Sequence, residues 1–319
     1  MERLKVFIGQ EVSDSGINYL KEKGYEVVYA PSKNFEDWAK NIADASAMMT
    51  RSSVGCPAYV LEAAKNLKVI GNYGVGVDKL DVKKATELGI QVTNGPLSNM
   101  ISVAEYTMTL ILALATDLAR LDSETRKGNW TKVRDTTKAM EINQRVLGLV
   151  GIGNIGSRVA EYAHAFGMEV IAYDAYAKPG SQHAYIKMMD TVEEVFSQAD
   201  VVSLHVPLTN ETRHWVDKRL LSLMKETSFI INCARGGIIE EQDLYDALKA
   251  GKLAGAGLNC FEQEPIDLAN PLLTLENVIV GPHSAGQTKD SIERMSLHAA
   301  IGIDEVLSGK KPSWPVNFR

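Results

Sequence analysis

Residues 145–174 read RVLGLVGIGNIGSRVAEYAHAFGMEVIAYD, and they are the most informative part of the chain about its fold. The apolar run 146–150 predicts a strand, and the amphipathic stretch 157–167 predicts a helix that ends at Gly167. The six residues between them, Gly151-Ile152-Gly153-Asn154-Ile155-Gly156, fit the pattern GxGxxG. Glycines at these positions permit a tight turn, so the amides near Asn154 and Ile155 can face a pyrophosphate at the positive end of the helix.

The next strand-like run, EVIAYD, ends at Asp174, eighteen residues after Gly156. A carboxylate there can accept hydrogen bonds from the adenine ribose hydroxyls of a dinucleotide and would repel a 2′-phosphate. The sequence therefore predicts an NAD site, with NAD favoured over NADP. The alternative is a tight turn followed by an exposed or helix-capping aspartate. The residues predicted to bind the cofactor here are Gly151, Gly153, Asn154, Ile155, Gly156 and Asp174.

Strand-like apolar runs alternate with helical stretches on both sides of this segment, which is typical of parallel α/β proteins. We predict two Rossmann- or flavodoxin-like α/β lobes with parallel sheets, joined by long helices, one of them over 101–121. The predicted domains are a discontinuous substrate-binding domain, residues 1–100 plus 290–319, and an NAD-binding domain over 101–289. Because ligands of open parallel sheets bind beyond the carboxyl ends of the strands, we expect the active site in the cleft between the lobes.

The composition argues against several classes of protein. The 319 residues hold 34 Lys+Arg and 40 Asp+Glu, for a formal net charge of −6, so no basic surface is expected to bind nucleic acid or an anionic membrane. The three cysteines, Cys56, Cys233 and Cys260, form no CxxC pair and no disulfide framework. Together with an N-terminus that lacks a signal-peptide pattern, they predict a cytoplasmic protein.

Two further sequence features bear on membranes and metals. The apolar stretch 101–121 approaches membrane-spanning length, but Glu105, Asp117 and Arg120 interrupt it, which favours a buried helix. No His, Cys or Asp cluster has the spacing of metal ligands, so we expect no metal.

Several stretches, in order and spacing, resemble the D-isomer-specific 2-hydroxyacid dehydrogenases, including the phosphoglycerate dehydrogenases and the hydroxypyruvate and glyoxylate reductases. The resemblance implies an NAD-dependent oxidoreductase that moves a hydride between NAD(H) and C2 of a small 2-hydroxy or 2-oxo acid. The matching stretches are GNYGVGVDKLD (71–81), SVAEYTMTLILAL (102–114), LGLVGIGNIG (147–156), HVPLTNETRHWVD (205–217), INCARGGIIEEQDLYDALKAGKLAGAGLNCFEQEP (231–265) and NVIVGPHSAGQT (277–288).

In that family an arginine, a glutamate and a histidine carry the reaction, and they fall here on Arg235, Glu264 and His283. Hydride transfer to a 2-oxo acid leaves negative charge on the carbonyl oxygen, and His283 can supply the proton near neutral pH. A buried Glu264 would hold the imidazole and favour its protonated form. Arg235 can bind the substrate carboxylate and polarise the ketone. Taken singly, each also has a structural interpretation: a packed histidine, a surface-paired arginine and a Glu-Pro turn.

The resemblance also implies that the backbone amides of Val75 and Gly76 bind the substrate carboxylate, the alternative being an ordinary turn between the lobes. One departure concerns Asn259, where the family usually has an aspartate that contacts the nicotinamide carboxamide. Asparagine keeps an acceptor, adds donors and loses the charge, so we predict that NAD still binds, with altered affinity or pH dependence. By the same resemblance, further residues along the cofactor are Val206, Pro207, Thr212, Cys233 and Ala234.

The sequence predicts the type of reaction but does not identify the substrate. Arg51-Ser52-Ser53 looks like the region where phosphoglycerate dehydrogenases hold the distal phosphate, so Arg51 and Ser52 are candidate substrate ligands. The second basic residue of that subgroup falls at Asn72, which is neutral. A phosphorylated acid and a smaller one, such as hydroxypyruvate or glyoxylate, both fit, and the alternative for Arg51 is a salt bridge within its lobe.

Two expectations concern partners. The resemblance implies a homodimer, with contacts through 101–121 and the arm 121–144. The alternative function is an NAD-sensing interaction protein, because the C-terminal binding protein corepressors share the fold and the catalytic residues. Against that alternative, we find neither a basic segment nor a long disordered tail.

Overall fold

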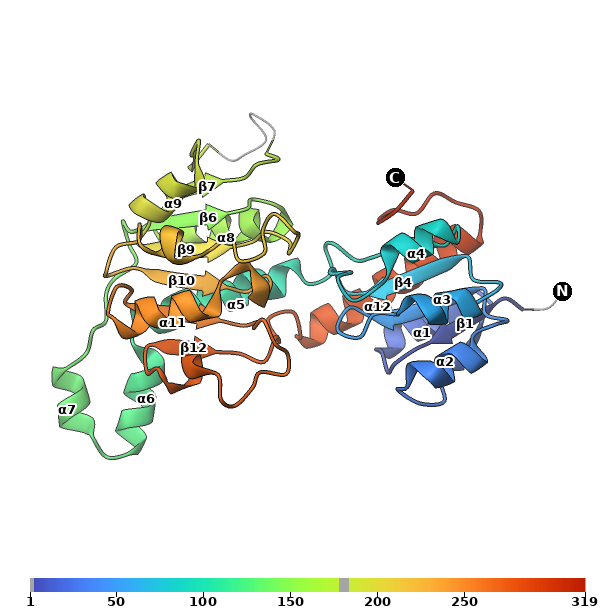
Figure 1. The fold of residues 1–319 in the computed structure, drawn as a ribbon, viewed down its shortest axis with the longest axis horizontal. Coiled ribbons are helices and arrows are strands. Elements are labelled where there is room, and N and C mark those ends of the chain that lie inside the picture. Colours follow the sequence, from blue (N-terminus) through green and yellow to red (C-terminus); the bar gives the residue numbers. More distant parts are fainter. Residues whose placement is uncertain (1–2, 178–183, 319) are drawn as a thin grey trace. The chain divides into compact units, whose positions relative to one another are not determined.

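The computed structural model describes residues 3–177 and 184–318. The chain forms two compact units, drawn in Figure 1: a first unit of Met1–Met100 with Gly286–Arg319, and a second unit of Ile101–Ala285. Each unit contains one sheet, and every strand pairing in both sheets is parallel. The predicted α/β class with two parallel sheets is thereby confirmed.

The first unit has a five-stranded sheet in the order β2-β1-β3-β4-β5. The chain leaves β1 towards one side and returns at β3 on the other, which makes the carboxyl ends of β1 and β3 a topological switch point. We call the edge of a sheet where its strands end the carboxyl edge. The strands are β1 (Lys5–Ile8), β2 (Glu26–Tyr29), β3 (Ala47–Arg51), β4 (Val69–Tyr73) and β5 (Gln91–Thr93).

Helices cover both faces of this first sheet because alternate side chains of each strand point to opposite faces. Val6 and Ile8 of β1 pack with the cluster of α1 and α12, whereas Phe7 packs with the cluster of α2, α3 and α4. The helices are α1 (Asp14–Glu22), α2 (Phe35–Asn41), α3 (Ala58–Ala63), α4 (Val82–Glu87) and α12 (Lys289–Leu307).

A C-terminal segment runs beside β5, at the edge of the first sheet. Val316 donates its amide to the Val92 carbonyl at 2.8 Å, and Asn94 donates its amide to the Trp314 carbonyl at 3.3 Å. The buried Asn317 side chain accepts from the Val92 amide at 2.7 Å and donates to the Ile90 carbonyl at 2.9 Å. These contacts fasten the segment to the sheet.

The second unit has a seven-stranded sheet in the order β12-β11-β10-β9-β6-β7-β8. This is the dinucleotide-binding arrangement, with the switch point between β6 and β9. The strands are β6 (Val146–Val150), β7 (Glu169–Tyr173), β8 (Ile186–Met188), β9 (Val201–Leu204), β10 (Phe229–Asn232), β11 (Gly255–Leu258) and β12 (Val278–Val280).

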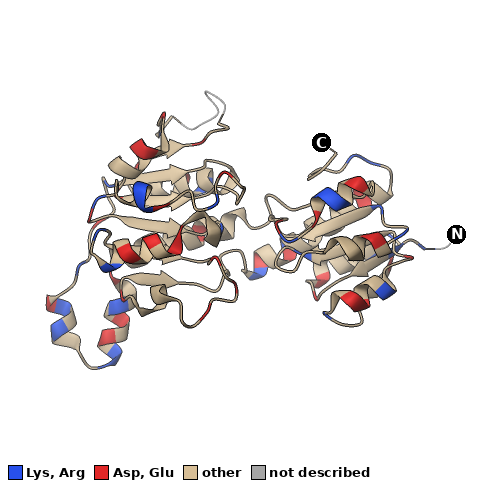
Figure 2. Ribbon diagram, in the orientation of Figure 1, with Lys and Arg blue, Asp and Glu red and all other residues tan. Residues whose placement is uncertain are grey.

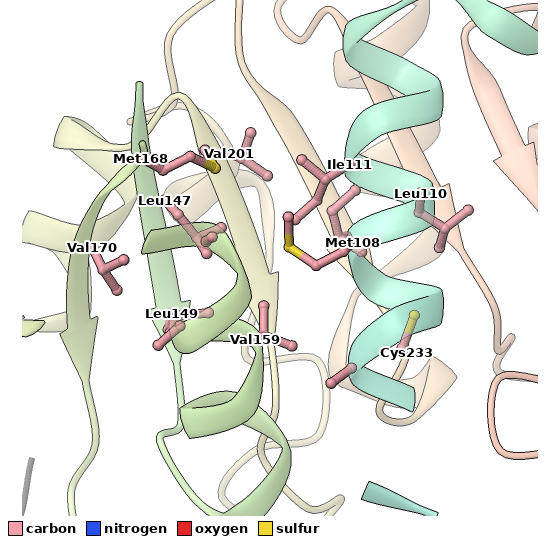
Figure 3. Close-up of a cluster of buried hydrophobic side chains, with 14 of the residues drawn as sticks. Met108, Leu110, Ile111, Leu147, Leu149, Val159, Met168, Val170, Val201 and Cys233 are labelled. Atoms are coloured by element: carbon pink, nitrogen blue, oxygen red, sulfur yellow. The ribbon is translucent and has the colours of Figure 1, made fainter. Parts of the chain in front are cut away.

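The second sheet is also buried on both faces. Figure 3 shows Met108 and Ile111 pointing from α5 towards Leu147 on β6 and Val159 on α8, which form one apolar cluster. A second cluster holds side chains of α9, α10 and α11. The helices of this unit are α5 (Met100–Ala115), α6 (Leu118–Arg126), α7 (Trp130–Asp135), α8 (Asn154–Ala165), α9 (Val192–Gln198), α10 (Lys218–Leu221) and α11 (Glu241–Lys249), with 3₁₀ turns η1 (Gly236–Ile238) and η2 (Pro271–Thr274).

The single helix predicted over 101–121 was wrong. The chain breaks between α5 and α6 and bends by 62°. Asp117 takes a left-handed conformation with φ 58°, and its carboxylate accepts from Arg120 Nε at 2.9 Å. The Ala115 carbonyl accepts from the Met140 amide at 2.7 Å, so it makes no hydrogen bond that would continue the helix.

In the described part of the chain, no single helix is long and apolar enough to cross a membrane, and only α5 and α6 taken together pass that test, as a bent pair. The apolar composition of α5 is accounted for by its buried residues, which include Ala104, Met108, Leu110 and Ile111.

Candidate active site

The glycine turn follows β6 at the carboxyl edge of the second sheet. A Cβ atom at Gly156 would lie 2.2 Å from the Gly151 carbonyl oxygen, and one at Gly151 (φ 94°) would lie 2.7 Å from the His205 carbonyl oxygen. A Cβ at Gly153 would meet no atom of the described residues within 4 Å. Two glycines are therefore required by packing inside the turn, and the third leaves its outer surface open.

Helix α8 begins directly after this turn, with Gly153 as an N-cap that provides no side-chain hydrogen bond. The amides of Asn154 and Ile155 donate to no other described residue. Unsatisfied amides at the positive end of a helix are the donors that bind a phosphate. The residues present thus fit the pyrophosphate of a dinucleotide.

Asp174 follows β7, the neighbouring strand, and contacts the turn. Its Oδ2 accepts from the Ile152 amide at 2.9 Å, and its Oδ1 accepts from the Tyr176 amide at 2.8 Å. Each carboxylate oxygen has a further lone pair, so the group retains acceptor capacity for hydroxyl groups. The glycine turn and Asp174 lie together, as the strand order requires.

On the opposite side of β6, the loop after β9 carries Val206, Pro207 and Thr212. A Cβ at Gly151 would lie 3.0 Å from a methyl group of Val206, so this side chain borders the glycine turn. Thr212 donates its hydroxyl to the Pro207 carbonyl at 2.7 Å, which closes the loop on itself.

Arg235 follows β10. Asn232, almost fully buried, accepts from the Ala234 amide at 3.0 Å and donates to the Arg235 carbonyl at 2.8 Å, so it fixes the backbone on both sides of the arginine side chain. A Cβ at Gly236 would lie only 1.9 Å from the Phe261 carbonyl carbon. The loops after β10 and β11 therefore touch, and Gly236 is the residue that permits the contact.

Glu264 and His283 form a pair on the loops after β11 and β12. His283 Nδ1 lies 2.8 Å from Glu264 Oε1 and 2.9 Å from Oε2. A carboxylate partner places the ring hydrogen on Nδ1, which leaves Nε2 for other chemistry. The side chains are 41% and 29% exposed for His283 and Glu264. The expectation of a buried carboxylate at Glu264 was therefore wrong: it is partly exposed.

Asn259, fully buried at the end of β11, holds the turn that carries His283. Its backbone carbonyl accepts from the His283 amide at 2.6 Å, and its Oδ1 accepts from the Ser284 and Ala285 amides at 3.0 and 3.2 Å. One residue thus binds three consecutive amides next to a histidine with φ 53°. The sequence indicates Asn259 only as a contact of the cofactor, and its role in this turn was not predicted because the amides that it binds are distant in sequence.

Two buried thiols and a partly buried histidine lie nearby. Burial raises the pKa of the Cys233 thiol to about 12 and that of Cys260 well above its ordinary value. Both are protonated at neutral pH and pack as thiols, not as thiolate nucleophiles. Burial also lowers the pKa of His205 to about 4, so this histidine is neutral where it borders the glycine turn.

The remaining predicted residues lie in the first unit. The Arg51 guanidinium stacks over the Tyr73 ring, 5.2 Å from its centroid, and forms no ion pair with any residue in 3–177 or 184–318. The salt bridge considered as an alternative is therefore not formed. Ser52 Oγ donates to the Tyr73 carbonyl at 3.1 Å, and the loop with Val75 and Gly76 follows β4 on the same carboxyl edge.

No group of three or more His, Cys, Asp and Glu side chains in the described residues is arranged to hold a metal ion.

The comparisons with known proteins agree with this geometry. The family model described as "D-isomer specific 2-hydroxyacid dehydrogenase, NAD binding domain" matches residues 108–285. A D-3-phosphoglycerate dehydrogenase of Methanocaldococcus jannaschii is 40% identical over 99% of this chain, which spans 60% of the length of that relative. A hydroxypyruvate reductase of Thermotoga maritima is 38% identical over 93% of this chain and 96% of its own.

A solved structure shows the same fold. The glyoxylate reductase of Paecilomyes thermophila superposes with a TM-score of 0.91 at 26% identity, over 99% of each chain. The family model covers the glycine turn and all three residues Arg235, Glu264 and His283. The prediction of the family is confirmed: the chain belongs to the D-isomer specific 2-hydroxyacid dehydrogenases, and its second unit contains their NAD binding domain.

Proposed function

We propose that the protein is an NAD-dependent oxidoreductase that interconverts small D-2-hydroxy acids and the corresponding 2-oxo acids. The observation that carries the proposal is the contact between His283 and Glu264, on adjacent strand ends of the sheet that also bears the glycine turn. Arg235 follows the next strand along that edge. A proton donor, its carboxylate partner and a cation are the groups that reduction of a 2-oxo acid requires.

The cofactor residues follow the same edge. The amides of Asn154 and Ile155 would hold the pyrophosphate, and Asp174 would accept from the ribose hydroxyls and disfavour a 2′-phosphate. When bound, the nicotinamide supplies or accepts the hydride at C2 of the acid. Residues proposed to line the cofactor beyond the turn are Val206, Pro207, Thr212, Cys233, Ala234 and Asn259.

In the direction of reduction, His283 gives its Nε2 proton to the carbonyl oxygen as hydride arrives at the carbon. Its Nδ1 hydrogen stays on the ring and is donated to the Glu264 carboxylate, which fixes the ring and stabilises the charged imidazole. Arg235 offers paired donors to the substrate carboxylate and to the oxygen that gains negative charge. In oxidation the same ring nitrogen accepts the hydroxyl proton.

The substrate is proposed from the first unit and from the relatives. Arg51, Ser52 and the amides of Val75 and Gly76 would bind it. Asn72 is fully buried and donates inward, so it offers nothing that could replace a second basic ligand to a phosphate. The names of the relatives support three candidate acids, and the buried Asn72 favours hydroxypyruvate or glyoxylate over phosphohydroxypyruvate.

The test is the loss of NADH absorbance with a panel of 2-oxo acids: hydroxypyruvate, glyoxylate, phosphohydroxypyruvate, pyruvate and a branched-chain acid. The His283→Ala variant is the control. Turnover in the wild type that the variant loses supports the reaction class, and the preferred acid identifies the substrate. NADH binding without turnover on any acid would instead favour an NAD-sensing interaction protein.

We further propose a cytoplasmic homodimer that pairs through α5 and the arm of α6 and α7. Leu118 and Trp130 of this arm are 59% and 64% exposed, and Figure 2 shows charges of both signs along its helices. Exposed large apolar side chains among mixed charges are typical of an interface. Gel filtration tests the proposal, because a species at the chain mass of 34.9 kDa would contradict it.

A further inference from the structure

Asn72 is the fourth residue of β4 and is completely buried. Its Nδ2 lies 2.8 Å from Ser52 Oγ, 2.9 Å from the Gly76 carbonyl oxygen and 3.4 Å from the Gly74 carbonyl oxygen. Its Oδ1 is buried without a hydrogen-bond partner among the described residues. The side chain thus donates to Ser52, which follows β3, and to the loop after β4, and its acceptor is unpaired.

This orientation of the amide is determined by its surroundings. The opposite orientation would place Oδ1 against the two carbonyl oxygens, which cannot donate. An unpaired buried acceptor destabilises the native state, and an apolar residue at this position would avoid it. Stability alone therefore does not explain why this residue is an asparagine. The hydrogen bonds that its side chain donates to the loop after β4 do explain it.

Two more contacts hold the same loop. Asn94 Nδ2 donates to the Val75 carbonyl at 2.8 Å, and the Gly95 amide donates to the Gly74 carbonyl at 2.9 Å. Together with Asn72, these groups bind the carbonyls of Gly74, Val75 and Gly76, which are consecutive.

Binding a carbonyl also orients an amide. In a trans peptide the C=O of one residue and the N–H of the next point in opposite directions within one plane. Fixing these carbonyls therefore points the amide of Val75 away from Gly95, that of Gly76 away from Asn94 and that of Val77 away from Asn72. None of these three amides donates to another described residue.

We propose that Asn72 and Asn94 are positioning residues for an anion site made of three consecutive amides, Val75, Gly76 and Val77. The proposal rests on the proposed function in one respect: the anion is the carboxylate of the 2-oxo acid. It adds Val77 as a third amide donor and assigns the geometry of the site to two asparagines that do not touch the substrate.

The test uses the isosteric variants Asn72→Asp and Asn94→Asp, which keep the shape of the side chain and lose its donors. With NADH saturating, each should raise the KM for the oxo acid about tenfold and leave kcat within about twofold, because a donor to a charged group is misplaced. NADH affinity should stay unchanged. Thr93→Val, a buried change in the same sheet whose hydroxyl makes only a 3.5 Å contact, is the matched control.

A pH profile separates positioning from loss of stability. A protonated carboxyl group has one hydrogen to donate, so the KM defect of Asn72→Asp should shrink as the pH falls, relative to wild type measured at each pH. An equal rise in KM for Thr93→Val, or a defect in Asn72→Asp that is independent of pH, would overturn the positioning role.

A measurement without turnover keeps the two proposals distinguishable. The protein is labelled with ¹⁵N at glycine and valine. Oxalate should then shift the amide resonances of Val75, Gly76 and Val77 in the wild type but not in Asn94→Asp. The Asn94 side chain is partly exposed, so a charge there destabilises the fold less than at the buried Asn72. Shifts in an enzyme that reduces no oxo acid would support the anion site and reject the proposed reaction. If Asn72→Asp and Asn94→Asp both keep normal turnover, an unaltered KM and the same oxalate-induced amide shifts, the anion site is overturned. The proposed reaction would still be supported.

Discussion

The His283 ring nitrogen Nδ1 contacts both oxygens of Glu264, at 2.8 and 2.9 Å, although the two residues lie on loops that follow different strands. The contact depends on the backbone around it. Asn259 binds the amides of residues 283–285, and the Glu264 Oε1 atom accepts from the Phe261 amide at 3.2 Å. Both members of the pair are therefore anchored to the end of β11.

Glu264→Gln should keep a hydrogen bond to His283 and remove the negative charge. We expect kcat for reduction to fall by about tenfold to a hundredfold, and His283→Ala to cost about a hundredfold to ten-thousandfold, because the proton donor itself is lost. Steady-state rates with saturating NADH measure both. Full activity of Glu264→Gln would show that the charge of Glu264 is not used.

The glycine turn predicts opposite phenotypes for two similar substitutions. Gly156→Ala places a Cβ 2.2 Å from a backbone oxygen and should lower the melting temperature. Gly153→Ala meets no atom within 4 Å in residues 3–177 and 184–318, so it should keep its melting temperature while it weakens NADH binding. Calorimetry and a fluorescence titration with NADH separate the two effects. Equal NADH affinity in Gly153→Ala and wild type would argue against a cofactor at this surface.

Asp174→Asn tests the choice of cofactor. The amide oxygen can still accept from the Ile152 or Tyr176 amide, so the turn is retained, but the repulsion of a 2′-phosphate is lost. We expect the ratio of kcat/KM for NADH over NADPH to fall by about tenfold. A ratio that does not move would place the source of discrimination at another residue.

His205 should make the free energy of unfolding fall as the pH falls. Its pKa is about 4 in the folded chain, because burial disfavours the charged ring, against about 6.5 when unfolded. Between these values the unfolded chain binds a proton that the native chain does not, so stability is complete above about pH 6.5 and falls as the pH drops to about 4. The loss amounts to about 3 kcal/mol.

Denaturant unfolding at several pH values measures this slope, with His205→Gln as the comparison. The variant should show a smaller loss over the same interval, since glutamine does not titrate. Parallel slopes for the two proteins would assign the acid sensitivity to other groups.

Much of the second unit could be predicted because its signals are local in sequence. Each predicted site residue of this unit follows an apolar strand, and parallel strands bring such positions to one edge of the sheet. These residues are the glycine turn, Asp174, Arg235, Glu264 and His283. The short elements α4 and β8 were not predicted, since six and three residues give little periodicity.

Other features depend on partners far away in the chain. The break at Asp117 needs Met140 to take a helix carbonyl, and the turn at His283 needs Asn259. Asn72 was compared in the sequence with a basic substrate ligand. Its side chain points inward because Ser52 and Gly76 present acceptors there, and only the folded chain brings them together.

The segment 313–317 has a consequence for self-association. β5 is one of the two outer strands of the first sheet, and an uncovered outer strand offers unpaired backbone groups to other chains. That edge is covered by Pro315, Val316 and the Asn317 side chain. The segment therefore prevents other chains from pairing with β5. Proteolysis or deletion of these residues should therefore appear first as aggregation, before any loss of the NAD binding domain in the other unit.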